Sequence, residues 1–135
     1  MKIILDTNVL VSAVLKDRGP QRVIEWILMH PDVEWVASEV ILSEYREVLS
    51  RTKFGLSESI LKDWFALFDE MIIKIKVDSD ISFPRDQKDA RFLTCALSSG
   101  AHYLVTGDRD FGDASKLVDT IIISVSMFLK HVCRE

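Results

Sequence analysis

The sequence contains few of the residues that mark specialised structural classes. Its 135 residues include only 2 Cys, 3 Pro and 5 Gly. Cys95 and Cys133 are too few for a disulfide-stabilised scaffold and lack metal-ligand spacing, so we expect a reducing, cytoplasmic environment. The scarcity of Pro and Gly beside 48% hydrophobic residues excludes collagen-like, low-complexity and disordered chains.

Long hydrophobic runs are also absent. No apolar stretch approaches the roughly 18 residues that a membrane span requires, so we expect no membrane segment. The apolar run at the start of the sequence meets Asp6 before the core of a signal peptide can form. The length is typical of one domain, and we therefore expect residues 1–135 to form a single domain.

Neither sign of charge dominates the composition. The chain has 17 Lys and Arg against 21 Asp and Glu, which gives a formal net charge of −4. A dedicated nucleic-acid-binding domain is usually basic, so the total charge argues mildly against that class. Where the acidic residues lie is more informative than how many there are.

Hydrophobic periodicity predicts strands that alternate with helices. The predicted strands are Lys2–Leu5, Val33–Ala37, Ile72–Val77, Tyr103–Val105 and Thr120–Ile123. The predicted helices are Val9–Leu15, Gln21–Met29, residues 39–51, residues 58–71, Gln87–Ser99 and Val125–Val132. This alternation predicts an α/β fold, a three-layer α/β/α sandwich around a mainly parallel sheet of about five strands.

Several residues predict where the helices begin and end. Asn8, Ser38 and Ser57 are the expected N-caps, since their side chains can accept a hydrogen bond from the first turn of a helix. Gly19-Pro20 is expected to break the first helix, and Gly100 to end the helix over Gln87–Ser99.

Acidic residues follow two of the predicted strands. Asp6 comes directly after the first strand, and Asp108 and Asp110 follow the strand that begins at Tyr103. Ligands of open parallel sheets bind at the carboxyl ends of the strands, so we expect these carboxylates at one edge of the sheet. Asp is also common in turns and caps, which is the structural alternative for each of them.

The helix over Gln87–Ser99 carries an acid on its apolar face. With residues at 100° intervals, Ala90, Leu93, Ala96 and Leu97 define that face, and Asp89 lies about 40° from Leu93. A carboxylate there is costly unless it is paired or binds a cation, which favours a functional role for Asp89. Asp86 also projects onto this face, but we favour it as the N-cap, and the third acid of the site could be either residue.

Glu44 lies on the flank of the core stripe of the helix predicted over residues 39–51, about 60° from Ile41. It has no Lys or Arg three or four residues away, whereas Glu47 has Arg51 as an ordinary surface partner. Glu44 is therefore a further candidate for the site, against the alternative of a semi-exposed helix former.

The candidate acids come from separate elements and have the same charge. They are Asp6, Glu44, Asp89, Asp108 and Asp110. Like charges brought together cannot all ionise without a compensating cation. An all-oxygen set suits Mg²⁺ or Mn²⁺, whereas zinc would require a His or Cys cluster that the sequence lacks. Divalent cations held by carboxylates indicate chemistry on phosphate esters.

Four segments in this order resemble the PIN domain, specifically the small prokaryotic PIN proteins that include VapC-type toxins. The matching segments are Asp6-Thr7-Asn8-Val9-Leu10, Ser43-Glu44, Asp89-Ala90-Arg91-Phe92-Leu93 and Thr106-Gly107-Asp108-Arg109-Asp110-Phe111. Together they span almost the whole chain, and the family fold is a parallel sheet between layers of helices.

The resemblance also implies a function. It implies catalytic, metal-binding acids at Asp6, Glu44, Asp89 and Asp108, a further metal ligand at Asp110, and polar support from Asn8 and Thr106. It implies a homodimer that cleaves an RNA substrate with Mg²⁺ or Mn²⁺ and is restrained by a partner antitoxin, as a toxin of a toxin–antitoxin pair. Metal-activated water would attack the phosphodiester in line and leave a 3′-hydroxyl and a 5′-phosphate.

Two other protein classes require a residue that the sequence lacks. A haloacid-dehalogenase-like phosphatase needs a second Asp where the chain has Asn8, and a receiver domain needs a lysine after the last strand, where residues 120–126 contain none. A non-catalytic PIN fold that binds RNA or a protein partner stays the main alternative. Candidate phosphate contacts are the cations Lys16, Arg18 and Arg22, with Arg85, Lys88, Arg91 and Arg109.

Overall fold

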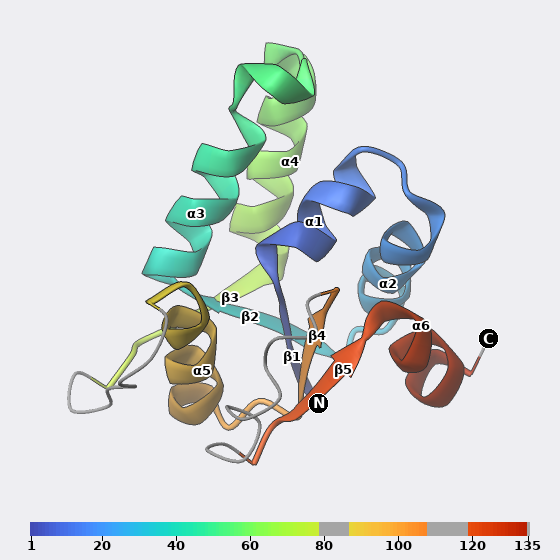
Figure 1. Cartoon of the computed structure of the whole chain (residues 1–135), viewed down its shortest axis with the longest axis vertical. Coiled ribbons are helices and arrows are strands. Elements are labelled where there is room, and N and C mark those ends of the chain that lie inside the picture. Colours follow the sequence, from blue (N-terminus) through green and yellow to red (C-terminus); the bar gives the residue numbers. More distant parts are fainter. Residues whose placement is uncertain (79–86, 108–118, 135) are drawn as a thin grey trace.

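The computed structural model describes residues 1–78, 87–107 and 119–134, with the backbone alone for 87–89. Five parallel strands form one sheet in the order β3-β2-β1-β4-β5 (Figure 1). The strands are β1 (Lys2–Leu5), β2 (Glu34–Ser38), β3 (Ile72–Ile75), β4 (Tyr103–Thr106) and β5 (Ile121–Ser124). The predicted five-stranded parallel sheet is therefore confirmed.

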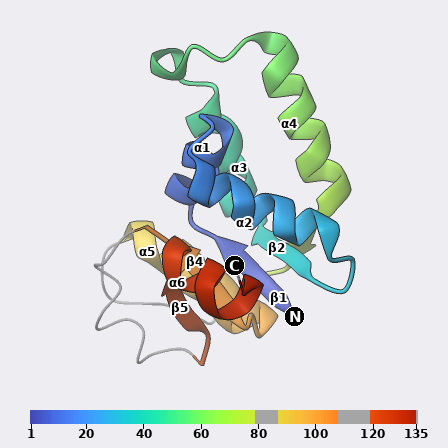
Figure 2. The same cartoon turned by 90° about the vertical axis from the view of Figure 1, so that its right-hand side faces the viewer.

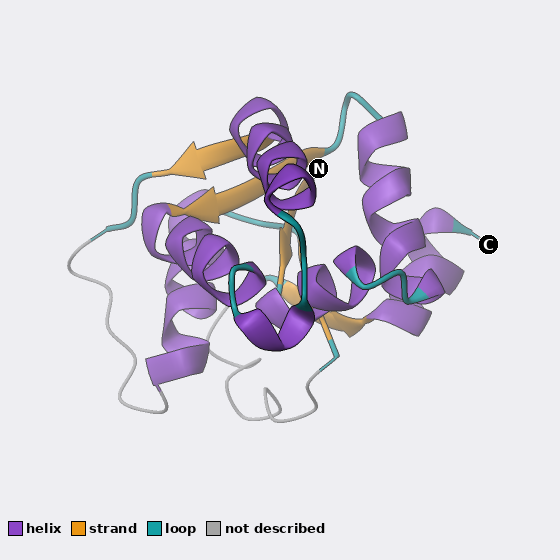
Figure 3. Cartoon of the chain, turned by 90° about the horizontal axis from the view of Figure 1, so that it is seen from above, coloured by secondary structure: helices purple, strands orange, loops and turns teal. Residues whose placement is uncertain are grey.

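Helices cover both faces of the sheet. They are α1 (Thr7–Val14), α2 (Arg18–Met29), α3 (Glu39–Leu49), α4 (Glu58–Met71), α5 (Gln87–Ser99) and α6 (Val125–Phe128). A 3-10 turn, Thr52–Phe54, joins α3 to α4, and a π-helical turn, Leu129–Cys133, continues α6. Helix α5 packs against β1, β2 and β3, whereas α1 and α6 contact β4 and α2 packs on both of them (Figures 2 and 3). This is the predicted three-layer arrangement.

The order of the strands fixes where a site can lie. From β1 the chain moves outward through β2 to β3, then returns to the other side of β1 to form β4 and β5. The direction of winding therefore reverses between β1 and β4. In open parallel sheets, ligands bind at the carboxyl ends of the strands beside such a reversal.

The central strands are buried apart from their first residues. Ile3, Ile4 and Leu5 of β1 and Leu104 of β4 have no exposed surface. Strands buried on both faces read as continuous apolar runs, which is the pattern of this sequence. Under α3 and α4, the rings of Trp35, Tyr45 and Phe68 pack on one another, with centroids 5.6–6.2 Å apart. This aromatic core joins β2, α3 and α4.

The predicted N-caps at Ser38 and Ser57 are confirmed, but the one at Asn8 is wrong. Ser38 and Ser57 accept from the backbone N–H groups of Ile41 and Ile60. Helix α1 begins at Thr7, and Asp6 occupies the extended position before it, so Asn8 lies exposed inside the helix. Asp6 still pairs with β4 through its N–H, and its carbonyl already accepts from the N–H groups of Val9 and Leu10. Asp6 is thus the single residue between β1 and α1.

Gly19-Pro20 does not separate the first two helices. Both residues lie in the first turn of α2, where a missing N–H costs little. The chain turns instead at Lys16, which adopts a left-handed conformation with φ 67°. Gly100, by contrast, has φ 65° directly after α5, as predicted for a helix terminator.

The buried face of α5 is rotated from the predicted one. Leu93 and Ala96 are buried as expected, but Leu97 is 43% exposed, and Phe92 and Cys95 are buried in its place. The other elements match their predicted ranges apart from shifted ends, such as β3 stopping at Ile75 and α6 changing to a π-helical turn after Phe128. In the described part of the chain, every helix is too short or too polar to span a bilayer.

Candidate functional site

Asp6 lies where the winding of the sheet reverses. Leu5 and Val105 are paired in the ladder between β1 and β4, so the next residues, Asp6 and Thr106, are neighbours. The Asp6 N–H donates to the Val105 carbonyl at 2.9 Å, and the Thr106 hydroxyl donates to Asp6 Oδ2 at 2.7 Å. Asp6 is 7% exposed and Thr106 is 3% exposed. The backbone and Thr106 therefore fix a buried carboxylate at the predicted edge.

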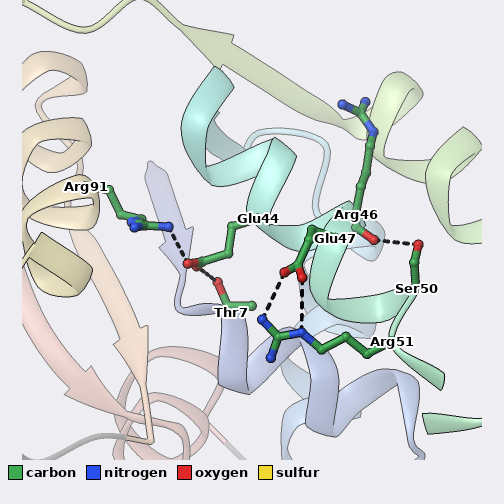
Figure 4. A network of polar contacts seen from close by, with 7 residues as sticks. All are labelled: Thr7, Glu44, Arg46, Glu47, Ser50, Arg51 and Arg91. Atoms are coloured by element: carbon green, nitrogen blue, oxygen red, sulfur yellow. Dashed lines mark hydrogen bonds and ion pairs between the residues drawn. The ribbon is translucent and has the colours of Figure 1, made fainter. Parts of the chain in front are cut away.

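Glu44 reaches the same edge from α3. Its Oε2 accepts from the hydroxyl of Thr7, the residue after Asp6, and its Oε1 accepts from Nη1 of Arg91 on α5 (Figure 4). The side chains of Glu44 and Arg91 are 21% and 28% exposed. Glu44 thus joins the first turn of α1 to the second turn of α5.

Tyr45 lies beneath both acids. Its side chain is fully buried and its hydroxyl donates to the Leu5 carbonyl, one residue before Asp6. Burial raises the pKa of the Tyr45 phenol, and the charges of Asp6 and Glu44 raise the pKa further. Glu44 accepts from Thr7, the residue that follows Asp6, so the two acids belong to the same edge of the sheet.

An open hollow of about 510 Å³ borders this site between α3 and α5. It is lined by Glu39, Val40, Ser43, Glu44, Glu47, Arg51 and Arg91. Two of its acids are already paired, Glu39 with Lys74 and Glu47 with Arg51. The Glu47–Arg51 pair was predicted as a surface interaction, and both side chains are about half exposed or more.

The structure brings together some of the predicted site residues. Thr106 contacts Asp6, and Glu44 contacts Thr7 beside Asp6. Position 89 lies in the first turn of α5, on the row of Leu93 and Ala96. Asn8 is exposed on α1. Nothing is described for the Asp89 side chain, and Asp108, Asp110 and the alternative acid Asp86 lie outside the described residues.

The candidate phosphate contacts are scattered. Arg18 pairs with Glu25 at 3.1 Å on the surface of α2, and Arg91 is engaged by Glu44. Lys16 is exposed at the turn before α2, and Arg22 lies on α2. Only the backbone of Lys88 is described, whereas Arg85 and Arg109 lie outside the described residues.

Three contributors were not predicted from the sequence. Thr7 and Tyr45 were not considered for the site, and Arg91 was considered only for phosphate. Arg91 contacts Glu44 across 47 positions, so inspection of near neighbours along α3 could not reveal it. The only local signal was that Glu44 lacked a basic partner on its own helix.

The donors present fit a hard divalent cation. Asp6 and Glu44 offer carboxylate oxygens, which Mg²⁺ and Mn²⁺ prefer. Within the described residues, no group of three or more His, Cys, Asp or Glu side chains could hold a metal. A complete set therefore requires acids beyond these two.

The protein is an α/β domain with an acidic site. The site contains buried Asp6, where the winding of the parallel sheet reverses, and Glu44 at the same edge. Residues 2–110 match the model of the PIN domain family, and the chain belongs to that family.

A relative from Methanocaldococcus jannaschii, "Uncharacterized protein MJ1680", is 28% identical over 114 residues, which are 82% of this chain and 72% of that protein. The fold is similar to VapBC2 from Rickettsia felis, solved bound to a DNA fragment from its promoter. That match has a TM-score of 0.65 and 17% identity, and covers 92% of this chain and 98% of the other.

Proposed function

We propose that this PIN domain is a divalent-metal-dependent endoribonuclease, the toxin of a toxin–antitoxin pair. The observation that carries the proposal is the buried Asp6 carboxylate, fixed by Thr106 where the sheet reverses, with Glu44 beside it. PIN domains are generally nucleases, and the similar Rickettsia felis structure is a VapBC complex. The VapBC complex supports an antitoxin partner for this chain, and the proposal adds an RNA substrate and a homodimer.

The site residues have distinct proposed roles. Asp6, Glu44, Asp89 and Asp108 would be the catalytic acids, with Asp110 as a further metal ligand and Asn8 and Thr106 as polar support. Bound Mg²⁺ or Mn²⁺ would supply Lewis acidity and lower the pKa of a coordinated water. Thr106 keeps the Asp6 carboxylate in one orientation, so little side-chain freedom is lost when the site is filled. Tyr45, fully buried with a raised pKa, stays neutral and orients the strand end.

Two broader properties are part of the proposal. Residues 1–135 form a single domain, and the protein works in the reducing cytoplasm.

The test is cleavage of structured and unstructured RNA with Mg²⁺, with Mn²⁺ and with EDTA. We expect cleavage only with metal, and products that carry a 5′-phosphate and a 3′-hydroxyl. Asp6→Asn should abolish cleavage. Asp63→Asn, which changes an exposed acid on α4, should retain it.

Two results would contradict the proposal. Cleavage that persists in EDTA would remove the metal from the mechanism. RNA or protein binding without any cleavage by a folded protein would identify a non-catalytic PIN module, the alternative reading of the same site.

A further inference from the structure

Both oxygens of the Glu44 carboxylate are already engaged. Thr7 donates to Oε2 and Arg91 donates to Oε1, as Figure 4 shows. The other ion pairs within the described residues are more open to water. Glu47 and Arg51 are 63% and 48% exposed, against 21% and 28% for Glu44 and Arg91. Water therefore screens the Glu44–Arg91 attraction less than it screens the surface pairs.

This pairing affects how Glu44 can bind a metal. A carboxylate whose charge is balanced by a guanidinium is a weaker ligand for a second cation, because the cation and the guanidinium repel each other. Oε1 keeps a free lone pair beside the Arg91 bond, but a metal bound there would lie close to the guanidinium charge, so metal binding favours withdrawal of Nη1. Thr7 is neutral, and its hydroxyl imposes no such repulsion.

The ion pair between Arg91 and Glu44 uses only part of the guanidinium. Arginine binds a carboxylate most strongly through two parallel N–H groups, but here only Nη1 donates to Glu44. Within the described residues, the Arg91 Nε–H is buried and has no hydrogen-bond partner. A guanidinium with one contact and one unsatisfied donor is easier to displace than a bidentate pair. Arg91 also lies two positions after Asp89 on α5, so its movement and metal binding involve the same helical turn.

We propose that Arg91 is an internal cation that competes with the divalent metal for Glu44. This rests on the proposed metal site and assigns Arg91 a positioning role. Without metal, Arg91 neutralises Glu44 and holds α5 against α3. When metal binds, Arg91 is displaced and Glu44 joins the ligand set. The affinity for metal is therefore lower than the acids alone would give.

Calorimetric titration with Mn²⁺ alone tests the competition. Arg91→Gln removes the charge, and we expect it to tighten Mn²⁺ binding about tenfold, a coupling typical of contacting residues. In the Glu44→Gln background, Arg91→Gln should tighten Mn²⁺ binding only about twofold, because the Glu44 carboxylate that it would free is missing. Arg91→Lys keeps the charge and should bind Mn²⁺ like the wild type.

Arg46→Gln is the matched control. Arg46 lies on the same helix as Glu44 but points away from it (Figure 4). It pairs with Asp69 at 3.0 Å. Loss of this charge should leave Mn²⁺ affinity unchanged. Thermal melts of all variants show which are folded.

A second measurement does not depend on affinity. The Nε–H signal of Arg91, assigned in a nitrogen-15 spectrum by its loss in Arg91→Gln, should shift when diamagnetic Mg²⁺ is added. The Arg46 signal should stay in place.

Several outcomes decide the matter. If Arg91→Gln raises Mn²⁺ affinity equally in the wild type and in Glu44→Gln, then Arg91 acts only through its long-range electrostatic field. That result would overturn the proposal. Unchanged or weaker binding by folded Arg91→Gln, or no binding by any variant, overturns it too. Mn²⁺ binding by Arg91→Gln but not by the wild type supports it. If the wild type cleaves RNA with metal but Arg91→Gln binds Mn²⁺ no more tightly, only this inference fails and the nuclease proposal stands.

Discussion

Thr106, at the end of β4, donates a 2.7 Å hydrogen bond to the carboxylate of Asp6, which lies 100 positions earlier. The two side chains meet because β1 and β4 are adjacent although β2 and β3 come between them in sequence. Both are buried, so the bond is made away from bulk water, where a hydrogen bond to a charged group is strong. The bond makes Thr106 the residue that orients the first acid of the site.

Replacing Thr106 by the isosteric Val should therefore weaken metal binding. Removing an orienting partner of a metal ligand typically costs about 10–100-fold in affinity. We expect Mn²⁺ affinity, measured by calorimetry, to fall by about tenfold or more in Thr106→Val. Thr106→Ser keeps the hydroxyl and should retain most of the affinity. Similar Mn²⁺ affinity in the two variants would show that the hydroxyl does not support the site.

Local rules predicted much of the fold. Ser38 and Ser57 cap their helices, and α5 occupies the predicted range Gln87–Ser99, because a capping side chain or a terminating Gly100 acts within a few residues. The parallel sheet follows from the regular alternation of strands and helices. These are short-range signals, and a single sequence carries them.

The errors arose where distant parts of the chain decide the outcome. Asn8 is a reasonable cap by itself, but the Asp6 N–H bonds to β4, the Asp6 carbonyl accepts the first bonds of the helix, and α1 therefore starts at Thr7. The pairing of Glu44 with Arg91 depends on how α3 and α5 pack, which no spacing within either helix specifies. The acid cluster could be predicted as a set of candidates, whereas its neutralising partner could not.

Mutation can decide whether Asp86 or Asp89 is the third acid of the site. Position 89 shares a row of α5 with buried Leu93 and Ala96, which favours Asp89. We expect Asp89→Asn to abolish metal-dependent RNA cleavage. Asp86→Asn should stay active and keep nearly all of its unfolding free energy, because Asn caps a helix about as well as Asp. An inactive Asp86→Asn with an active Asp89→Asn would reverse the assignment.

The buried thiol of Cys95 predicts a loss of stability at alkaline pH. Burial raises its pKa from 9.0 to about 11, opposed by a smaller effect of its hydrogen bond with the Ser38 backbone. Between these values the unfolded thiol loses its proton while the folded thiol keeps it. The unfolding free energy therefore falls by up to about 1.4 kcal/mol per pH unit. The raised pKa of Tyr45 acts in the same direction above its ordinary value of 10.0.

Urea unfolding between pH 8 and 11, with reductant present, measures this slope. Cys95→Ala should be less stable at every pH but should lose stability less steeply above pH 9, because only the Tyr45 contribution remains. The same slope in the variant and the wild type would contradict the assignment to Cys95.

Thermal melts with and without metal test whether the acids form a binding site or a structural network. Carboxylates gathered without their cation repel one another, so neutralising one relieves repulsion. Asp89→Asn and Asp108→Asn should therefore melt at or above the wild type in EDTA. A structural acid behaves in the opposite way, because loss of a paired or hydrogen-bonded carboxylate destabilises the fold. Asp63→Asn, which changes an exposed acid on α4, is the reference for a surface charge.

Added Mg²⁺ or Mn²⁺ should raise the melting temperature of the wild type by mass action. At a metal concentration about 100 times Kd, the stabilisation is about 2.7 kcal/mol. Both variants should gain less, because each lacks a ligand, whereas Asp63→Asn should gain as much as the wild type. Two variants that are clearly less stable in EDTA, in a protein that metal does not stabilise, would show that these acids are structural. The nuclease proposal would then depend on membership of the PIN domain family alone.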